Sequence, residues 1–381
     1  MAIARGDAVA LARALIKIDS RNPTLARDGP GEGEVARILA SVLDDWGFSV
    51  ELADVVPGRP NLIARMGPAG APALMLNGHL DVVGVEGMTH KPFAAELRAG
   101  RIYGRGSADM KGGIAAMCAA ACGASAESDR QILVTAVADE EYESLGLRAL
   151  LASGVRAEAA IVTEPTQLAI CPAHRGFAWL DVKFTGRAAH GSRYDIGVDA
   201  ILHAGLLLAE LDALEKTRAN GPVHPLLGRG SLHASTIQGG VGMSTYPERC
   251  DLALERRTLP GESAEAAIRE VTEACERVRA RRPELSAEVR LRTAQAPSDV
   301  PVDAPIVGRL RKALESESMP VRIAGLSAWT DAALLNEAGI PAVCFGPGDI
   351  SLAHAAEEFV PVTEIEQCAR VLTQVVHDWC N

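Results

Sequence analysis

The chain has 381 residues, of which 48% are hydrophobic and 23% are charged, and this length suggests two compact units. The composition excludes a disordered or fibrous protein. Because the net charge is −11, which opposes attraction to phosphate backbones and anionic membrane surfaces, neither a nucleic acid nor a membrane is an expected partner.

The first segment, Met1–Ser20, carries charged side chains without a continuous hydrophobic centre, which predicts an amphipathic helix and not a signal peptide. No stretch approaches the ~18 apolar residues that span a bilayer. The eight cysteines are scattered, and no pair has Cys-x-x-Cys spacing. These features predict a cytoplasmic protein in a reducing compartment.

Apolar runs of strand length alternate with helical stretches, which predicts an α/β fold with a mainly parallel central sheet covered by helices. The most regular runs are Ala73–Asn77, Gln131–Ala138, Ala159–Thr163 and Pro341–Phe345. The helices between them, for example Glu32–Trp46 and Gly113–Ala121, are expected to be amphipathic.

Residues 178–292 differ in pattern from the chain on either side. The expected elements there are a strand alternating from Trp179, a helix near Asp199–Thr217, a polar hairpin-like stretch over Arg249–Arg257 and a charged helix over Ser263–Arg281. This β-α-β-β-α-β-type order predicts a ferredoxin-like α+β domain, inserted into a catalytic domain formed by residues 1–177 and 293–381.

Histidines and carboxylates follow the carboxyl ends of the predicted strands, where open α/β sheets place their ligand sites. In chain order these residues are His79, Asp81, Asp109, Glu140, Glu141, Glu164 and, after the turn Gly346–Gly348, His354. Each one alone would more often be a structural residue or a solvated acidic group. Gathered carboxylates, however, repel one another unless a cation neutralises them, so the joint pattern favours metal binding.

The ordered motifs resemble those of the M20 metallopeptidases. The matching segments are His79-x-Asp81, Gly-Ser-Ala-Asp109-Met-Lys-Gly, Asp-Glu140-Glu141, Thr-Glu164-Pro-Thr and Gly346-Pro-Gly followed by His354. The family comprises zinc amidohydrolases, among them the acetylornithine deacetylase and succinyl-diaminopimelate desuccinylase types. The resemblance covers essentially the whole chain. It implies a zinc-exopeptidase-like catalytic domain, a lid and dimerisation domain, and a homodimer.

The resemblance also implies two Zn²⁺ ions per chain, for which Co²⁺ or Mn²⁺ would be acceptable substitutes. The implied ligands are His79 and Glu164 for one ion, Glu141 and His354 for the other, and Asp109 as the bridge between them. Asp81 is then expected to accept the second imidazole N–H of His79. Glu140, left without a metal, is expected to be the general base and acid.

In the inserted segment, His190 resembles a lid histidine that reaches the partner's metal centre across a dimer interface. Arg257, preferred over Arg256, resembles the arginine that binds the substrate's free carboxylate. The backbone of Gly346 would line the pocket. Two positions depart from the family. Ser244 stands where an asparagine is common, so a hydrogen bond to the substrate is expected to be shorter or missing. Glu143 stands where a glycine is common.

The expected reaction is metal-dependent hydrolysis of the amide bond of a small N-acyl amino acid. A dipeptidase or carboxypeptidase of the same family is the alternative. A non-catalytic binding protein on the same scaffold should have lost a ligand or the base, and every one of these residues is present. The sequence does not indicate which acyl group and amino acid are accepted.

Overall fold

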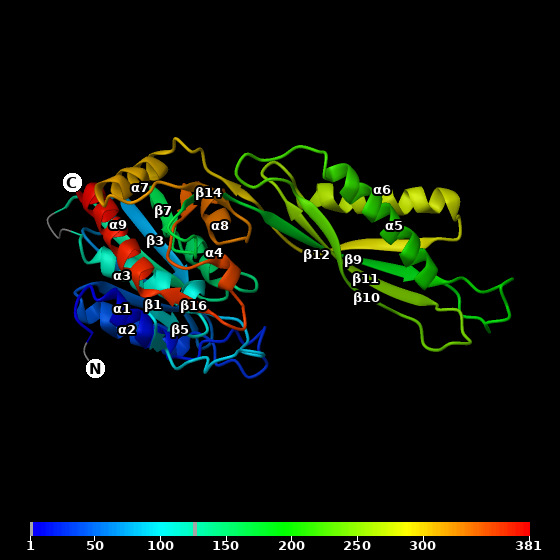
Figure 1. Cartoon of the computed structure of the whole chain (residues 1–381), viewed down its shortest axis with the longest axis horizontal. Helices are drawn as coiled ribbons and strands as arrows, with labels where there is room; N and C mark the ends of the chain where they lie inside the picture. The colour runs from blue at the N-terminus through cyan, green and yellow to red at the C-terminus, as the bar shows by residue number, and fades with distance from the viewer. Residues whose placement is uncertain (1–2, 125–127) are drawn as a thin grey trace. The chain divides into compact units, whose positions relative to one another are not determined.

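The computed structural model describes residues 3–124 and 128–381, and the chain divides into two compact units (Figure 1). Unit 1 consists of Met1–Pro172, Val300–Leu326 and Thr330–Asn381, and unit 2 of Ala173–Asp299 and Ser327–Trp329. Unit 2 extends further at both ends than the expected inserted segment, 178–292, because the first strand of its sheet in chain order begins at Gly176 and the last ends at Gln295.

The main sheet of unit 1 has the strand order β1-β2-β6-β3-β7-β15-β8, and β14 also pairs with β8. The strands are β1 (Ser49–Val56), β2 (Arg59–Met66), β3 (Ala73–His79), β6 (Gln131–Val137), β7 (Ala159–Val162), β8 (Ile170–His174), β14 (Ile323–Leu326) and β15 (Ala342–Cys344). The central pairs, β6-β3, β3-β7 and β7-β15, are parallel. The predicted α/β fold class is therefore confirmed, and the antiparallel pairs lie on either side of this centre.

A small sheet of unit 1 has the order β16-β5-β4 and joins the chain after β3 to the segment before the last helix. Its strands are β4 (Glu96–Arg98), β5 (Arg101–Tyr103) and β16 (Phe359–Pro361). The helices of unit 1 are α1 (Ala8–Ile16), α2 (Gly33–Asp45), α3 (Gly112–Ala121), α4 (Leu145–Ala152), α7 (Pro305–Ser316), α8 (Ala332–Glu337) and α9 (Val362–Cys380), with short turns η1 (Ser107–Lys111) and η2 (Ile350–Leu352).

The helices bear out the predicted amphipathic pattern in one case and contradict it in another. Helix α2 buries Val35, Ala36, Leu39 and Leu43 and exposes much of its other face, as expected. Every residue of α3 is buried, because this helix contacts the sheet as well as α1 and α9 (Figure 1). The prediction that α3 is amphipathic was therefore wrong: its alanines and glycines allow close packing on all sides.

The first helix begins later than the expected segment, at Ala8, because the Asp7 carboxylate accepts the backbone N–H of Ala10 and caps it there. Among residues 3–124 and 128–381, no helix is both long and apolar enough to cross a membrane.

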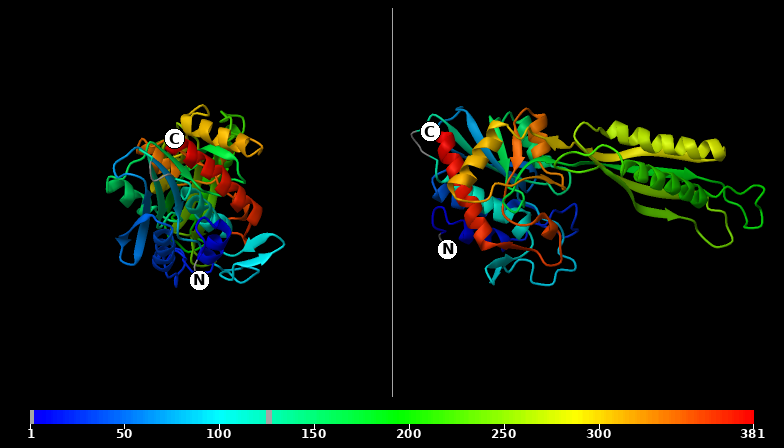
Figure 2. Two further views of the ribbon diagram at one scale, coloured as in Figure 1. Left: turned by 90° about the vertical axis from the view of Figure 1, so that its left-hand side faces the viewer. Right: turned by 45° about the horizontal axis from the view of Figure 1, so that its top comes forward.

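Unit 2 follows the predicted β-α-β-β-α-β order. Its elements are β9 (Gly176–Thr185), α5 (Ala200–Arg218), β10 (Ser231–Gly239), β11 (Arg249–Thr258), α6 (Ala264–Arg281) and β12 (Ser286–Gln295), followed by the two-residue strand β13 (Ser298–Asp299). The sheet order is β10-β11-β9-β12. Both helices cover one face of this sheet (Figure 2), and the apolar side chains of β9 and β11 alternate into the core beneath them. The expected hairpin-like stretch over Arg249–Arg257 is instead one continuous interior strand.

Candidate active site

The parallel strands of unit 1 deliver most of the candidate residues to one edge of the sheet. His79 is the last residue of β3, Glu140 and Glu141 follow β6, and Glu164 follows β7. Because neighbouring parallel strands end at the same edge, these side chains converge there. Asp109 comes from the turn η1, directly before α3, and His354 follows η2.

Asp109 lies between the two histidines. Its Oδ1 is 3.0 Å from His79 Nε2, and its Oδ2 is 3.5 Å from His354 Nε2. On the far side, His354 Nε2 is 3.0 Å from Glu141 Oε2. One carboxylate therefore directs each of its oxygens to a different imidazole, which is the arrangement that a bridging ligand of two cations requires.

Glu140 and Glu164 lie on the His79 side of the cluster. The oxygens Glu140 Oε2 and Glu164 Oε1 are each 3.9 Å from His79 Nε2. Two sets of possible ligand atoms lie within 4.8 Å of one another, namely His79 with Asp109 and Glu141, and His79 with Glu140 and Glu164. The structure therefore brings together all the expected metal-site residues, and it places Glu140 as close to His79 as the expected ligand Glu164.

The donor set of this cluster fits divalent metal ions. Imidazole nitrogens and carboxylate oxygens are ligands that Zn²⁺ accepts. Glu141 Oε1 is buried and has no hydrogen-bond partner among the described residues, which is costly unless a cation binds it. The residues present therefore fit the expected pair of ions.

The pKa values of the cluster also indicate a site for divalent ions. Burial, together with the negative charge of neighbouring carboxylates, raises the pKa of Glu140 and of Glu164 well above the usual range. Hydrogen bonds to Asp109 and Glu141 raise the pKa of His354 to about 10. Without a cation, then, the cluster holds protons to balance its charge, and divalent ions would take the place of those protons.

Asp81 contacts His79 through its backbone carbonyl and not, as expected, through its carboxylate. His79 Nδ1–H donates to the backbone carbonyl of Asp81 at 2.9 Å, while the nearer carboxylate oxygen, Oδ1, lies 3.6 Å away. The Asp81 carboxylate instead accepts the backbone N–H groups of Glu140 (3.1 Å) and Glu141 (3.2 Å). Asp81 thus orients the imidazole through its main chain and holds the turn after β6 through its side chain.

Glu358 supports the site but was not among the predicted residues. Its buried carboxylate accepts the N–H groups of Ala108 (3.0 Å) and Asp109 (3.2 Å) and pairs with Arg105 at 2.7 Å. It therefore fixes the turn that carries Asp109. These contacts join residues about 250 positions apart, so no local sequence pattern indicates them.

Gly346 was expected to line the pocket, and in the structure its backbone packs closely against the segment 163–168. Its N–H donates to Thr166 Oγ1 at 3.1 Å, and its carbonyl accepts the N–H of Leu168 at 3.0 Å. A Cβ atom here would lie 2.4 Å from the carbonyl oxygen of Thr163 and 2.5 Å from that of Glu164. Glycine is needed because this backbone packs directly on the segment that carries Glu164.

His190 and Ser244 lie in unit 2 and are both exposed. His190 Nδ1 is 2.8 Å from Ser192 Oγ, and the backbone of His190 pairs with that of Thr245, the neighbour of Ser244. The two expected lid residues therefore belong to adjoining segments. Glu143, in unit 1, is also exposed, so water screens its charge.

The two candidate arginines on β11 have different surroundings. Arg256 is buried and pairs with Glu262 (2.6 Å) and Glu270 (3.3 Å). Arg257 keeps 33% of its side chain exposed, stacks over the ring of Phe177 and pairs with Glu255. Of the two, only Arg257 has a guanidinium group accessible to a ligand.

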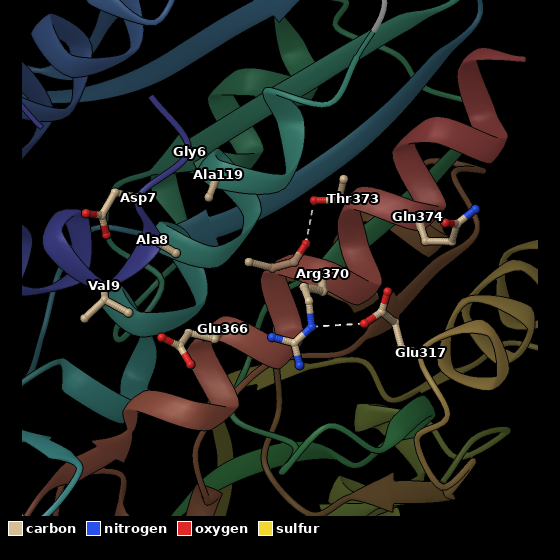
Figure 3. A pocket seen from close by; sticks show the side chains of 11 residues that line it. Gly6, Asp7, Ala8, Val9, Ala119, Glu317, Glu366, Arg370, Thr373 and Gln374 are labelled. Carbon is tan, nitrogen blue, oxygen red and sulfur yellow. Dashed lines mark hydrogen bonds and ion pairs between the residues drawn. The ribbon is translucent and has the colours of Figure 1, made fainter. Parts of the chain in front are cut away.

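A separate hollow on unit 1 contains none of the candidate residues (Figure 3). It is lined by the start of α1 and by α9. Three of the charged side chains drawn there have structural partners, because Arg370 pairs with Glu317 and Asp7 caps α1. The hollow therefore shares no residue with the candidate site.

Residues 75–378 match the family described as peptidase family M20/M25/M40. The acetylornithine deacetylase of Myxococcus xanthus is 32% identical over 355 residues, which cover 89% of this chain and 90% of that protein. In fold, the chain resembles the aminopeptidase PepT of Bacillus cereus, with a TM-score of 0.79, 21% identity and complete coverage of both chains. It also resembles the YXEP protein of Bacillus subtilis, described as a dinuclear metal-binding peptidase of family M20, with a TM-score of 0.72, 16% identity and coverage of 98% and 97%.

Proposed function

Because this chain belongs to peptidase family M20/M25/M40, we propose that it hydrolyses the amide bond of a small N-acyl amino acid, as a deacetylase does. The observation that carries this proposal is the position of Asp109, with one oxygen toward His79 and the other toward His354. A carboxylate shared in this way is suited to hold two cations at one substrate carbonyl.

Two ions fit the residues of this site as follows. His79, Asp109 and Glu164 would hold one ion, and Asp109, Glu141 and His354 the other, since the histidine of each set lies within 3.9 Å of its two carboxylates. Zn²⁺ is the proposed metal, with Co²⁺ or Mn²⁺ as substitutes. When bound, the ions supply Lewis acidity, which polarises the amide carbonyl and makes the attacking water more acidic.

Glu140 acts as the proton carrier. Its buried carboxylate faces the same imidazole as Glu164 at the same distance, so it is near enough to exchange a proton with a water that attacks at this site while the other residues hold the ions. It takes a proton from the water as the carbonyl is attacked and returns that proton to the nitrogen of the leaving amine. Asp81 maintains this geometry by holding the backbone N–H of Glu140.

Two residues of unit 2 complete the proposal. Arg257, with its partly exposed guanidinium group, binds the free carboxylate of the substrate. His190 acts in a homodimer, where it donates a hydrogen bond to the oxyanion in the partner's site. Both segments of the lid that carry His190 and Ser244 are exposed and available for such contacts.

The compartment proposed for this enzyme is the cytoplasm. All eight cysteines are free thiols, and all but Cys122 are buried. Unpaired thiols are typical of proteins in reducing compartments.

A substrate panel tests the proposed function. Purified protein loaded with Zn²⁺, Co²⁺ or Mn²⁺ should hydrolyse at least one of N-acetylornithine, N-succinyl-diaminopimelate and N-acetylmethionine, and chelation should abolish this turnover. Hydrolysis of dipeptides alone would favour the dipeptidase alternative. Turnover that persists undiminished in chelator would contradict the metal mechanism.

A further inference from the structure

The buried side chain of Asn22, far from the motifs in the sequence, links two carboxylates that hold the turn after β6, those of Asp81 and Asp139. The Asn22 side chain is fully buried, and its Nδ2 donates to Asp81 Oδ2 at 2.8 Å and to Asp139 Oδ1 at 2.9 Å. Its Oδ1 accepts the N–H of Thr24 at 2.9 Å. Only the amide NH₂ group can donate to two carboxylates at once, so this network fixes the orientation of the side chain.

Each of these carboxylates fixes part of the turn that carries the proposed base. Asp81 accepts the N–H groups of Glu140 and Glu141. Asp139 itself begins the turn with φ at +67°, in the left-handed region that is unfavourable for a residue with a side chain. Its Oδ2 accepts the N–H of Glu143 at 3.3 Å. The backbone around the proposed base thus has a conformation that is uncommon for a residue with a side chain, and these contacts stabilise it.

A buried ion-pair network anchors the same turn on its other side. Arg59 binds Glu32 at 2.6 Å and Asp139 at 2.9 Å, and Glu32 accepts the N–H of Asp139 at 3.1 Å. Three buried carboxylates, those of Glu32, Asp81 and Asp139, therefore share one guanidinium group and one neutral amide. Asn22 separates two of these like charges and links them through hydrogen bonds.

From this arrangement we infer that Asn22 is a positioning residue, which acts through Asp81 and Asp139 to set the direction of the Glu140 and Glu141 side chains at the metal site. This inference rests on the proposed function for its catalytic part. Residues that orient the groups around a metal in this indirect way typically contribute about 10–100-fold to activity or metal affinity.

The test uses two variants and a matched control. Asn22→Ala removes the two hydrogen bonds to Asp81 and Asp139 and the one from Thr24, and Asn22→Asp keeps the shape but places a carboxylate between two others. The control is Asn336→Ala. The Asn336 side chain also makes three hydrogen bonds in unit 1, but all of them are to backbone groups of Ala332 and Ala342, away from the turn. Thermal unfolding of all three variants identifies any that do not fold.

The first readout is kinetic. With metal content per chain measured alongside, both Asn22 variants should lower kcat about 10–100-fold while KM stays within about threefold. Asn336→Ala should lower the unfolding temperature while leaving kcat unchanged. An equal loss of kcat in the control, at equal loss of stability, would show that Asn22 is only structural.

The second readout does not depend on activity. In the metal-free protein, the backbone amides of the segment 139–141 should exchange with deuterium at least about tenfold faster in both Asn22 variants, and at the wild-type rate in the control. Unchanged exchange in the Asn22 variants would overturn the inference, whatever the substrate. If instead the exchange result holds and the wild type hydrolyses no N-acyl amino acid, the proposed function fails while the positioning role stands.

Discussion

The buried side chain of His174, the last residue of β8, should make the stability of this protein depend on pH. His174 Nδ1–H donates to the Arg175 carbonyl at 3.1 Å, and its Nε2 is buried without a partner among the described residues. The ring lies edge-on to Trp329, with centroids 6.4 Å apart. Burial lowers the pKa of His174 from its usual 6.5 to about 4, although the hydrogen bond to Arg175 partly opposes this.

The sign and size of the effect follow from these values. Between pH 6.5 and pH 4 the unfolded chain binds a proton at this residue that the folded chain does not, so stability is lost as the pH falls through this window. The full difference corresponds to about 3 kcal/mol, of which about 2 kcal/mol is already lost at pH 5. Above pH 6.5 the residue makes no pH-dependent contribution.

Urea unfolding of the wild type and His174→Phe measures this contribution, with both proteins in chelator so that metal loss does not add to it. The phenylalanine ring keeps the contact with Trp329 and does not titrate. At pH 8 the two proteins differ by a constant amount, which comes from packing and from the loss of the hydrogen bond to the Arg175 carbonyl. From pH 8 to pH 5 the wild type should lose about 2 kcal/mol more unfolding free energy than the variant. Parallel pH profiles would refute the argument.

Three further predictions concern the other candidate residues. Arg257→Lys should lower kcat/KM for free-acid substrates, because an ammonium group cannot form the planar two-point pair, and equal rates on free-acid and amidated substrates would remove this residue from the site. Gly346→Ala should cost about 3 kcal/mol of unfolding free energy, because its Cβ would meet two carbonyl oxygens within 2.5 Å, and an unchanged thermal midpoint would contradict this. His190→Ala should lower kcat about 10²–10³-fold, and mixing it with Glu140→Gln should restore part of the activity in hybrid dimers. A fully active monomer would exclude the role proposed for His190.

Strand periodicity located the edge of the sheet at which the site lies. The apolar runs that end near His79, Glu140 and Glu164 are parallel neighbours in the structure, so the side chains that follow them meet. The inserted domain was also predictable, because its alternating strands and charged helices differ from the apolar runs around them.

Contacts between distant residues were not predictable. Asn22 meets Asp81 and Asp139 across 59 and 117 positions, and a lone asparagine in a loop has no periodicity that would reveal this. Helix α3 was misjudged for a related reason, since alanine fits a buried position as well as an exposed one, and tertiary packing decides between them. The contact of Asp81 also depended on the exact turn geometry, which directs its carbonyl and not its carboxylate to His79.

The central claim is that Glu140 carries a proton while its neighbour Glu141 holds a metal ion, and a single comparison tests it. Metal content and turnover per bound metal should be measured together for Glu140→Gln and Glu141→Gln. Glu140→Gln should retain two ions per chain and lose about 10²–10⁴-fold in kcat, whereas Glu141→Gln should bind less metal. A Glu140→Gln protein that loses metal yet keeps its turnover per ion would contradict the account.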